Sequence, residues 1–349
     1  MTQPWPRVSQ ELPGSALIRC SPEDFRVSEQ LAFELSGEGE HCFLHLQKRE
    51  VNSMDLLRRV SELSSVPLRD IGYSGLKDRN AVTQQWVSVG MAGRVEPDWE
   101  ALEALGDVQV LAVDRHLRKL RRGVHRANRF TLVLRQLTGD AAQLEQHLQL
   151  LRATGGPNYF GEQRFGRNGS TLEQARHWMR GGRRISREKR SLYYSALRAY
   201  VFNRMLALRV ERGDWNTVLP GDVCLLHGTR SHFVCEEVTD DIRTRAVDGD
   251  IHPGVPLWGR GQAGLFSQPQ EDSLADCRDI CDFLEASGLE LAWRPARLLA
   301  DDFCWQFCDD STLRLEFSLG AGSYATALLA EFVQYKEGCK DSGISSEQD

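Results

Sequence analysis

The chain has 349 residues, of which 41% are hydrophobic and 26% charged, and its formal net charge is −6. This length predicts two domains or one large domain with an insertion, and the composition excludes a wholly disordered chain. No apolar run approaches the roughly 18 residues of a membrane-spanning helix, and the N-terminal residues lack the apolar segment of a signal peptide. Nine cysteines in such a chain indicate free thiols in a reducing compartment. We therefore expect a cytoplasmic protein.

The charges are unevenly distributed along the chain. Residues 1–230 hold 34 basic and 26 acidic side chains, whereas residues 231–349 hold 9 basic and 23 acidic ones. Two basic segments, residues 115–129 and 176–190, contain seven Lys or Arg each, with Glu188 as their only acid. Phosphate contacts supply most of the non-specific affinity for nucleic acids, so this pattern favours a polyanionic partner over a merely solvated basic face.

In chain order, the first part of the sequence predicts strands mixed with helices. Alternating or short apolar runs predict strands at residues 16–20, 25–29, 42–47, 70–73, 85–89, 108–113 and 130–137. Ser53 opens a helix whose apolar face carries Leu56, Leu57, Val60 and Leu63. Asp140 starts a second helix, residues 141–153.

A glycine-rich break at residues 154–157 marks a domain boundary. Beyond it the pattern predicts helices at residues 171–179, 191–211 and 272–287, and strands at 223–226, 233–235, 303–307 and 313–318. A last helix is capped by Ser323, and the polar tail, residues 342–349, is expected to be disordered. The simplest organisation is a discontinuous α/β domain, residues 1–154 and 299–349, with a more helical domain inserted at 155–298.

Two pairs of cysteines have CxxxC spacing. Cys277 and Cys281 share one helical face with apolar residues, as core positions do, and Cys304 and Cys308 fall in a strand that we expect to be buried. Zinc sites use two-residue spacers and a second pair of ligands, so neither pair predicts a metal site. The glycine-rich residues 319–326 lack the lysine of a phosphate-binding loop, so we expect no nucleotide cofactor.

The loop at residues 74–81 is the most informative local feature. Asp78 lies between Lys77 and Arg79, and Gly75 permits a sharp turn. Adjacent cations favour an ionised carboxylate, which is what nucleophilic attack at a sugar's anomeric carbon requires. An ordinary exposed turn explains the same residues. A glycosidase would need a second acid facing Asp78, and the motifs supply none.

Residues 155–166, GGPNYFGEQRFG, interleave Arg164 with three aromatic residues. Such a segment suits stacking on unpaired bases and pairing with phosphate, but a tight junction whose aromatics pack inward fits equally well. The Asn128 amide could read a base edge, whereas the alternation around Phe130 predicts a core strand position.

Several segments together resemble the TruD family of tRNA pseudouridine synthases. They are SPEDFRVSE (21–29), GLKDRNAVTQQW (75–86), RANRFTLVLR (126–135), PNYFGEQRFG (157–166) and GAGSYAT (320–326), in matching order and spacing over essentially the whole chain. The resemblance implies an α/β fold of the α+β type. Its catalytic domain would have a mixed, largely antiparallel sheet with helices, and residues 155–298 would form an inserted α/β TRUD domain.

The resemblance further implies an isomerase that converts uridine 13 of tRNA to pseudouridine without a cofactor or metal. Asp78 matches the family's nucleophile, and Phe25, Asn128 and Tyr324 match substrate-contacting positions. Phe130 matches an aromatic that stacks near the base, and Lys77 is the expected partner of the Asp78 carboxylate. The family has Phe where this chain has Tyr324.

We expect tRNA as the partner of a monomeric protein without membrane association. The alternative is a non-catalytic tRNA-binding or chaperone module, which would need the two basic segments but not Asp78.

Overall fold

The computed structural model describes residues 5–182, 184–229, 231–261 and 274–338. The chain forms two compact units, which are described separately. The sheet unit contains Gly14–Gly139, Ala300–Gly322 and Gln334–Asp349; the helical unit contains Met1–Pro13, Asp140–Leu299 and Ser323–Val333. The domain division predicted from the sequence, at residues 154 and 299, stays a prediction.

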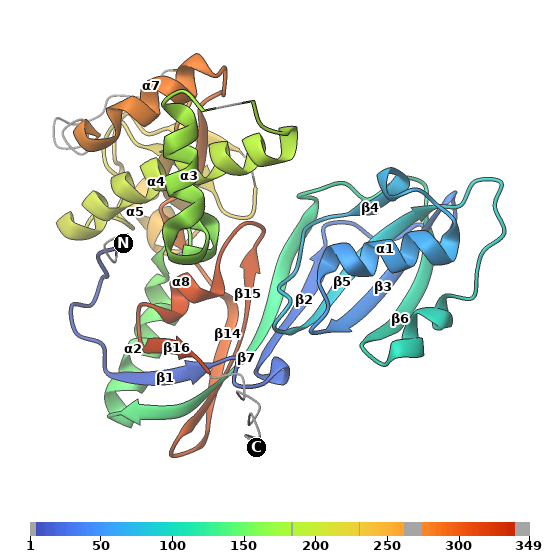
Figure 1. Cartoon of the computed structure of the whole chain (residues 1–349). Coiled ribbons are helices and arrows are strands. Elements are labelled where there is room, and N and C mark those ends of the chain that lie inside the picture. The colour runs from blue at the N-terminus through green and yellow to red at the C-terminus, as the bar shows by residue number, and fades with distance from the viewer. Residues whose placement is uncertain (1–4, 183, 230, 262–273, 339–349) are drawn as a thin grey trace, which may run out of the picture. The chain divides into compact units, whose positions relative to one another are not determined.

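The sheet unit is an α/β structure with one large sheet (Figure 1). Its elements are β1 (Gly14–Ile18), β2 (Phe25–Leu31), β3 (His41–Arg49), α1 (Ser53–Ser64), β4 (Ile71–Tyr73), β5 (Val82–Gly90), β6 (Val108–His116), β7 (His125–Gly139), β14 (Asp301–Asp309), β15 (Thr312–Gly320) and β16 (Gln334–Glu337). The strand order is β14-β15-β7-β2-β5-β3-β6, with β1 beside β7 and β16, and β4 beside β5. The β2–β5 and β1–β16 pairs are parallel, so the sheet is mixed and largely antiparallel, as predicted.

Helix α1 covers the buried side of β3. Its residues Leu56, Leu57 and Val60 are buried, which confirms the helical spacing predicted from the sequence. The Asn52 side chain caps the helix by accepting a hydrogen bond of 2.8 Å from the Met54 N–H. These side chains share a core with Cys42, Leu44 and Leu46 of β3, so the helix fixes the strand that lies beside the loop at residues 74–81.

Strand β7 begins at His125, five residues before the predicted strand. Its early part pairs with both neighbours: Asn128 lies opposite Glu29 of β2 and opposite Leu319 of β15. Backbone pairing on both sides therefore extends the strand into the first basic segment, although the composition there is polar. As a result, the end of that segment has a fixed register beside β2.

The helical unit surrounds the long helix α4 (Figure 1). Its elements are α2 (Ala141–Thr154), β8 (Gly156–Pro157), α3 (Ser170–Met179), α4 (Arg187–Arg212), β9 (Val223–Leu226), β10 (His232–Val234), α5 (Asp240–Val247), β11 (Ile251–Leu257), α7 (Arg278–Ala286), β12 (Ala292–Pro295), β13 (Arg297–Leu298) and α8 (Ala325–Leu329). One sheet has the order β10-β9-β11-β12, and β13 pairs with β8. Cys277 and Cys281 are buried in this core, as the sequence predicted.

Four local expectations need correction or limitation. Strand β14 forms as predicted, but Cys304 and Cys308 are exposed because they lie on the face of β14 opposite the buried Phe303. The N-cap of α8 is Tyr324 rather than Ser323. Helix α7 is shorter than predicted, and both residues 272–273 and the tail at 342–349 lie outside the described residues. Among the described helices, none is long and apolar enough to cross a membrane.

Candidate active site

The loop at residues 74–81 joins β4 to β5, and its backbone is held by two buried side chains. The Lys48 ammonium on β3 donates to the carbonyl oxygens of Val51 at 2.8 Å and Asp78 at 2.7 Å. Ser53 Oγ accepts from the Lys77 N–H at 2.9 Å. Burial lowers the pKa of Lys48 to about 8, an effect that the Asp78 carboxylate opposes and Lys77 reinforces. The main chain at Asp78 is therefore anchored to β3 and α1.

The Asp78 carboxylate is paired with Arg19. The distance from Arg19 Nη2 to Asp78 Oδ2 is 3.0 Å, and the Asp78 side chain keeps 38% of its surface exposed, against 8% for Arg19. The Arg19 guanidinium also lies over the Phe25 ring, 4.0 Å from its centroid, and contacts Glu337 at 2.8 Å. A positioned, ionised carboxylate that solvent can still reach is suited to nucleophilic attack.

Lys77 is not the partner of the Asp78 carboxylate, which corrects the expectation from the sequence. Its ammonium forms an ion pair with Glu29 on β2, and both side chains are almost entirely buried. Glu29 also accepts from the Trp86 N–H at 3.3 Å. Alternate residues of a strand point to the same face, so Glu29 lies on the buried face of β2 with Phe25 and Val27. Its carboxylate is therefore within reach of Lys77 in the loop.

Gly75 also differs from expectation. Its backbone does not adopt the left-handed conformation that favours glycine. A Cβ added at this position would lie 3.6 Å from the side chains of His125 and Lys77, which is an ordinary van der Waals distance. The loop turns without a special glycine conformation, and its shape depends on the anchors at Lys48 and Ser53.

Phe25 and Phe130 lie on adjacent strands with their rings edge to face. Their centroids are 6.2 Å apart, and Phe130 stacks on Phe317 of β15 at 5.4 Å. The exposed fractions are only 2% for Phe25 and 7% for Phe130, as expected of core strand residues. Contact of either ring with a base therefore stays a prediction.

Asn128 lies near the nucleophile loop and contacts His125. Asn128 Nδ2 and His125 Nε2 are 3.3 Å apart, while Asn128 Oδ1 is buried without a hydrogen-bond partner among the described residues. Burial lowers the pKa of His125, and the Lys77 ammonium lowers it further, while Glu29 opposes the change. The structure thus brings Phe25, Asn128, Phe130, Lys77 and Asp78 together in the sheet unit.

Tyr324 belongs to the helical unit, where Arg164 holds it. The Tyr324 hydroxyl accepts from Arg164 Nε at 2.9 Å and from Nη2 at 2.6 Å, and Arg164 Nη1 donates to Ser195 Oγ at 2.9 Å. The Phe160 ring lies edge-on to Tyr324 with centroids 6.1 Å apart. The Tyr324 hydroxyl is therefore held by Arg164 within its own unit, and that the family has Phe at this position stays a prediction.

The aromatic residues of the segment at 155–166 pack inward. Tyr159, Phe160 and Phe165 are all buried in the core around α4. Of the two interpretations left open by the sequence, the structure favours a packed junction for these rings. Arg164, one of the polar residues of this segment, positions Tyr324.

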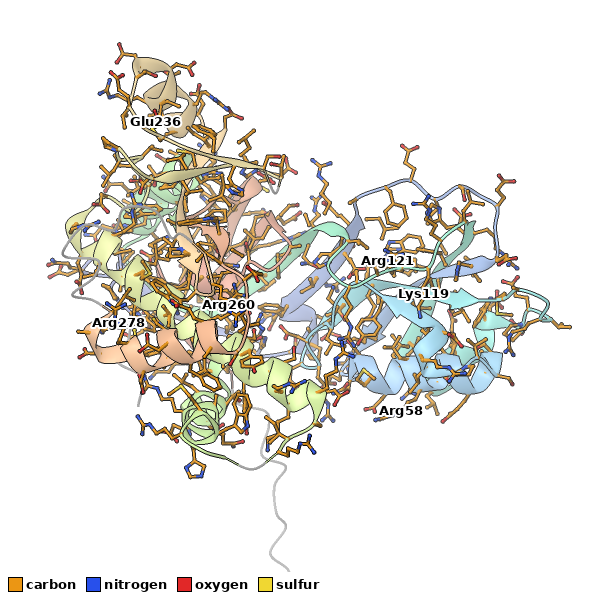
Figure 2. The ribbon with its side chains drawn as sticks, turned by 90° about the horizontal axis from the view of Figure 1, so that it is seen from above. Arg58, Lys119, Arg121, Glu236, Arg260 and Arg278 are labelled. Atoms are coloured by element: carbon orange, nitrogen blue, oxygen red, sulfur yellow. The ribbon has the colours of Figure 1, made fainter. Side chains whose placement is uncertain are left out.

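Both basic segments are partly paired within the fold; in the first, Arg115 pairs with Glu96 and Arg129 with Glu316. In the first, Lys119 donates to the Arg69 carbonyl and Arg122 to the Tyr73 hydroxyl, and both Lys119 and Arg121 lie on the connection between β6 and β7 (Figure 2). Three of its arginines are exposed and have no ion-pair or hydrogen-bond partner within the described chain: Arg118, Arg121 and Arg126. In the second segment, Arg176 lies over the Tyr200 ring and Arg180 pairs with Asp279 at 3.7 Å.

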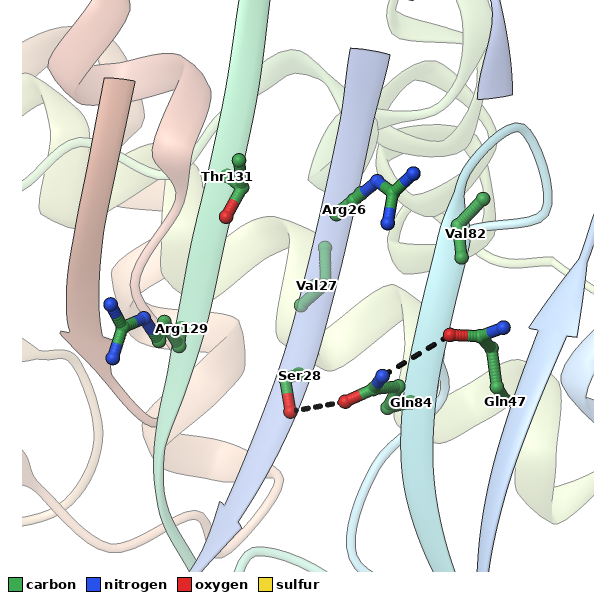
Figure 3. Close-up of a pocket in the computed structure, with 8 residues that line it drawn as sticks. All are labelled: Arg26, Val27, Ser28, Gln47, Val82, Gln84, Arg129 and Thr131. Carbon is green, nitrogen blue, oxygen red and sulfur yellow. Dashed lines mark hydrogen bonds between the residues drawn. The ribbon is translucent and has the colours of Figure 1, made fainter. Parts of the chain in front are cut away.

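A pocket of about 140 Å³ lies on the opposite face of β2 and is lined by Arg26, Val27, Ser28, Gln47, Val82, Gln84, Arg129 and Thr131 (Figure 3). Its polar floor is a ladder of hydrogen bonds: Ser28 Oγ donates to Gln84 Oε1 at 2.8 Å, and Gln84 Nε2 donates to Gln47 Oε1 at 3.1 Å. Because these groups satisfy one another, we interpret the ladder as structural cross-strand pairing rather than a ligand site. No three His, Cys, Asp or Glu side chains of the described residues cluster to hold a metal ion.

Sequence reasoning missed Arg19, Lys48, Glu29 and His125. Two of them carry a signal: Lys48 continues the alternation of Cys42, Leu44 and Leu46, and Glu29 continues that of Phe25 and Val27. A charged residue on the buried face of a strand indicates a functional or structural partner. Arg19 and His125 carry no comparable signal in the sequence.

Known proteins resemble this chain along nearly its whole length. The family model described as tRNA pseudouridine synthase D (TruD) matches residues 8–173 and 170–332. The tRNA pseudouridine synthase D of Methylococcus capsulatus is 45% identical over 334 residues, covering 95% of this chain and 94% of that protein. That of Nitrosococcus oceani is 43% identical over 328 residues, covering 93% and 92%. A crystal structure of a putative tRNA pseudouridine synthase D from Methanosarcina mazei shares the fold, with a TM-score of 0.68, 20% identity and coverage of 94% and 95%.

Proposed function

Because the chain belongs to the tRNA pseudouridine synthase D (TruD) family, we propose that it isomerises uridine 13 of tRNA to pseudouridine with Asp78 as the nucleophile. The observation that carries the proposal is the Asp78 carboxylate itself. It is half-exposed, paired with Arg19, and mounted on a loop whose backbone is anchored by Lys48. It combines an anchored main chain with a partly exposed side chain, and by the sequence resemblance it matches the family's nucleophile.

In the proposed reaction, Asp78 Oδ attacks either C1′ of the ribose or C6 of the base. The bond between N1 and C1′ breaks, the uracil rotates, and C5 forms the new bond to C1′. The hydrogen on C5 leaves as a proton, and N1 takes up a proton, so the product is an isomer of the substrate. If Asp78 attacks C1′, its bond to C1′ breaks when C5 displaces the carboxylate. If Asp78 attacks C6, its bond to C6 breaks when the carboxylate is eliminated. The isomerisation is redox-neutral and draws on no cofactor or metal.

The other site residues have supporting roles in this proposal. Arg19 orients the carboxylate, and Phe25, Phe130, Asn128 and Tyr324 contact the flipped nucleotide. Flipping the base costs a few kcal/mol, which phosphate contacts from the basic segments offset. We assign residues 1–154 and 299–349 to the catalytic domain and 155–298 to the TRUD domain of a monomeric, cytoplasmic enzyme.

Asp78→Asn tests the nucleophile. We expect it to abolish tritium release from tRNA labelled at C5 of uridine, while filter binding of the same tRNA stays within a factor of about three. Asp70→Asn is the matched control, because Asp70 is exposed and precedes β4 at the base of the same loop. Full activity of Asp78→Asn would overturn the assignment.

Carbodiimide mapping of pseudouridine in tRNA, with and without the protein, tests the position. A pseudouridine signal gained at nucleotide 13 supports the proposal. A signal gained only at another nucleotide would contradict the proposed position. The exposed arginines 118, 121 and 126 also favour the alternative of a non-catalytic tRNA-binding module. That alternative is supported if the protein binds tRNA and no pseudouridine depends on it.

A further inference from the structure

The contact between His125 and Asn128 constrains the tautomer of the histidine. Both residues are on β7, and Asn128 Nδ2 lies 3.3 Å from His125 Nε2. An amide nitrogen only donates hydrogen bonds, so Nε2 is the acceptor. In this amide orientation a neutral imidazole carries its proton on Nδ1, which is also buried without a hydrogen-bond partner among the described residues.

This contact also fixes which atom of the Asn128 amide remains available. With Nδ2 turned to His125, Oδ1 is buried and has no hydrogen-bond partner among the described residues. A buried acceptor that meets no donor is costly, and a ligand that brings an N–H group removes that cost. Uracil carries such a donor at N3, whereas unmodified cytosine has an acceptor at that position.

We propose that His125 is a positioning residue, which holds the Asn128 amide so that Oδ1 is presented to an N–H of the target base. Protonation of the imidazole then rotates the amide by half a turn. This inference rests on the proposed function, in which Asn128 contacts the flipped uridine. It adds a residue that acts through Asn128 and does not itself touch the reacting atoms.

Burial and the Lys77 ammonium favour the neutral form of His125. The Lys77 ammonium of the nucleophile loop and the Glu29 carboxylate of β2 both face the imidazole, and they are paired with each other. Burial and Lys77 lower the pKa of His125 below the usual value for histidine, and Glu29 opposes them. When the ring is protonated, Nε2–H and Nδ2–H would face each other as two donors, so the amide must rotate by half a turn. Nδ2 would then meet the N–H of the base.

Two variants separate the hydrogen bond from the titration. His125→Gln offers a carboxamide oxygen that can accept from Asn128 Nδ2 but does not titrate, and His125→Leu offers no acceptor. For wild-type protein, kcat/KM on tRNA should fall about tenfold per pH unit below the pKa of His125. His125→Gln should stay within about threefold of wild type at pH 8 and lose this acid limb, whereas His125→Leu should lose about tenfold or more at pH 8.

A spectroscopic measurement on RNA-free wild-type protein tests the pair independently of activity. Histidine-selective NMR labelling should show the Nδ1–H tautomer of His125 at pH 8, and the Asn128 side-chain amide signals should shift with the same midpoint as the imidazole. The His125 signal is assigned by its loss in His125→Gln, and thermal unfolding of each variant verifies the fold.

The inference would be overturned if kcat/KM of His125→Leu at pH 8 equalled that of wild type. It would also be overturned if both variants kept the fall of kcat/KM at low pH. Either result leaves the proposed function intact. An Nε2–H tautomer at pH 8 would overturn the inference as well. If wild-type protein makes no pseudouridine at any pH, the proposed function fails, and the catalytic part of this inference fails with it.

Discussion

Arg19 contacts three groups that the sequence separates widely. Its guanidinium pairs with Asp78, reaches Glu337, and covers the Phe25 ring. The backbone at Arg19 lies at φ 55°, in the left-handed region, which turns the side chain back along β2 immediately after β1 ends. Arginine suits this place because its planar fork can bind two carboxylates while its face stacks on an aromatic ring.

We expect Arg19→Met to lower kcat for pseudouridine formation by about 10- to 100-fold, because a charge-assisted hydrogen bond worth about 1.5–3 kcal/mol is lost at the nucleophile. Arg19→Lys should lose less, since it keeps the charge but not the fork. Tritium release under saturating tRNA measures kcat. Arg26→Met, on the opposite face of β2, is the control and should retain wild-type kcat; equal losses in Arg19→Met and Arg26→Met would contradict the argument.

Tyr324 offers a second test at the scale of one atom. Removing its hydroxyl in Tyr324→Phe leaves two Arg164 donors without their acceptor but keeps the ring. Because the loss is structural, the free energy of unfolding should fall by about 1–2 kcal/mol while kcat changes less than about threefold. Urea denaturation and tritium release measure the two quantities. A collapse of kcat at unchanged stability would instead place the hydroxyl in the reaction.

At the scale of elements, the nucleophile loop depends on the strand and helix beside it. Lys48 of β3 and Ser53 of α1 bond to loop backbone groups, and α1 shares a core with β3. The loop is consequently positioned by main-chain contacts, and its side chains remain available for chemistry. This division explains how a short polar loop can hold a carboxylate in place without a special glycine conformation.

Lys48→Met tests the anchor. The carbonyl oxygens of Asp78 in the loop and of Val51 before α1 lose their donor, so kcat for pseudouridine formation should fall by about tenfold or more as the carboxylate loses its fixed position. The comparison is Arg58→Met on α1, an exposed arginine paired only with the exposed Asp55, which should behave as wild type. Retention of full kcat in Lys48→Met would show that the loop holds its shape without this bond.

The same variant predicts a pH effect on stability. Burial lowers the pKa of Lys48 to about 8 in the folded protein, below the ordinary lysine value of 10.5. Between these two pH values the unfolded chain binds more protons than the folded protein, so this group makes the free energy of unfolding rise with pH. Urea denaturation at pH 8 and pH 10 should therefore show wild type gaining stability relative to Lys48→Met. A relative loss over this interval would contradict the direction of the shift.

The sequence predicted most elements because their periodicities are local. The spacing of Leu56, Leu57 and Val60 is enough to identify α1, and alternation is enough to identify β3. The same alternation would have placed Lys48 on the buried face. By contrast, the contact of Arg19 with Asp78 follows from a left-handed residue and a strand pairing far along the chain, and neither is encoded in a local pattern.

At the scale of the whole molecule, the net charge of −6 conceals exposed basic groups that remain unpaired. The first basic segment was predicted as a phosphate-binding surface, and its arginines 118, 121 and 126 point to solvent in the described structure. Many charges elsewhere are already used within the fold, as Arg209 is with Asp222 at 2.9 Å. The distribution of unpaired cations therefore matters more for RNA binding than the sum of charges.

The salt dependence of tRNA binding tests this surface. Each of Arg118→Gln, Arg121→Gln and Arg126→Gln should weaken binding and reduce the slope of log K against log salt by about 0.7–0.9 for a lost phosphate contact. Arg243→Gln is the control, because Arg243 is exposed but paired with Asp240 on α5. Filter binding at several salt concentrations gives the slopes; slopes equal to wild type in all three variants would exclude contact with phosphate.

The pairing of β1 with β16 has a consequence for biosynthesis. Ser15 lies opposite Gln334 in a parallel pair, and Arg19 reaches Glu337 across a sequence separation of 318 residues. A ribosome releases β1 long before its neighbour exists, so the sheet unit stays incomplete until β16, Gln334–Glu337, has been synthesised. The residue that steadies Asp78 reaches its second carboxylate only then. Products truncated before Glu337 would accordingly lack the second carboxylate that Arg19 contacts.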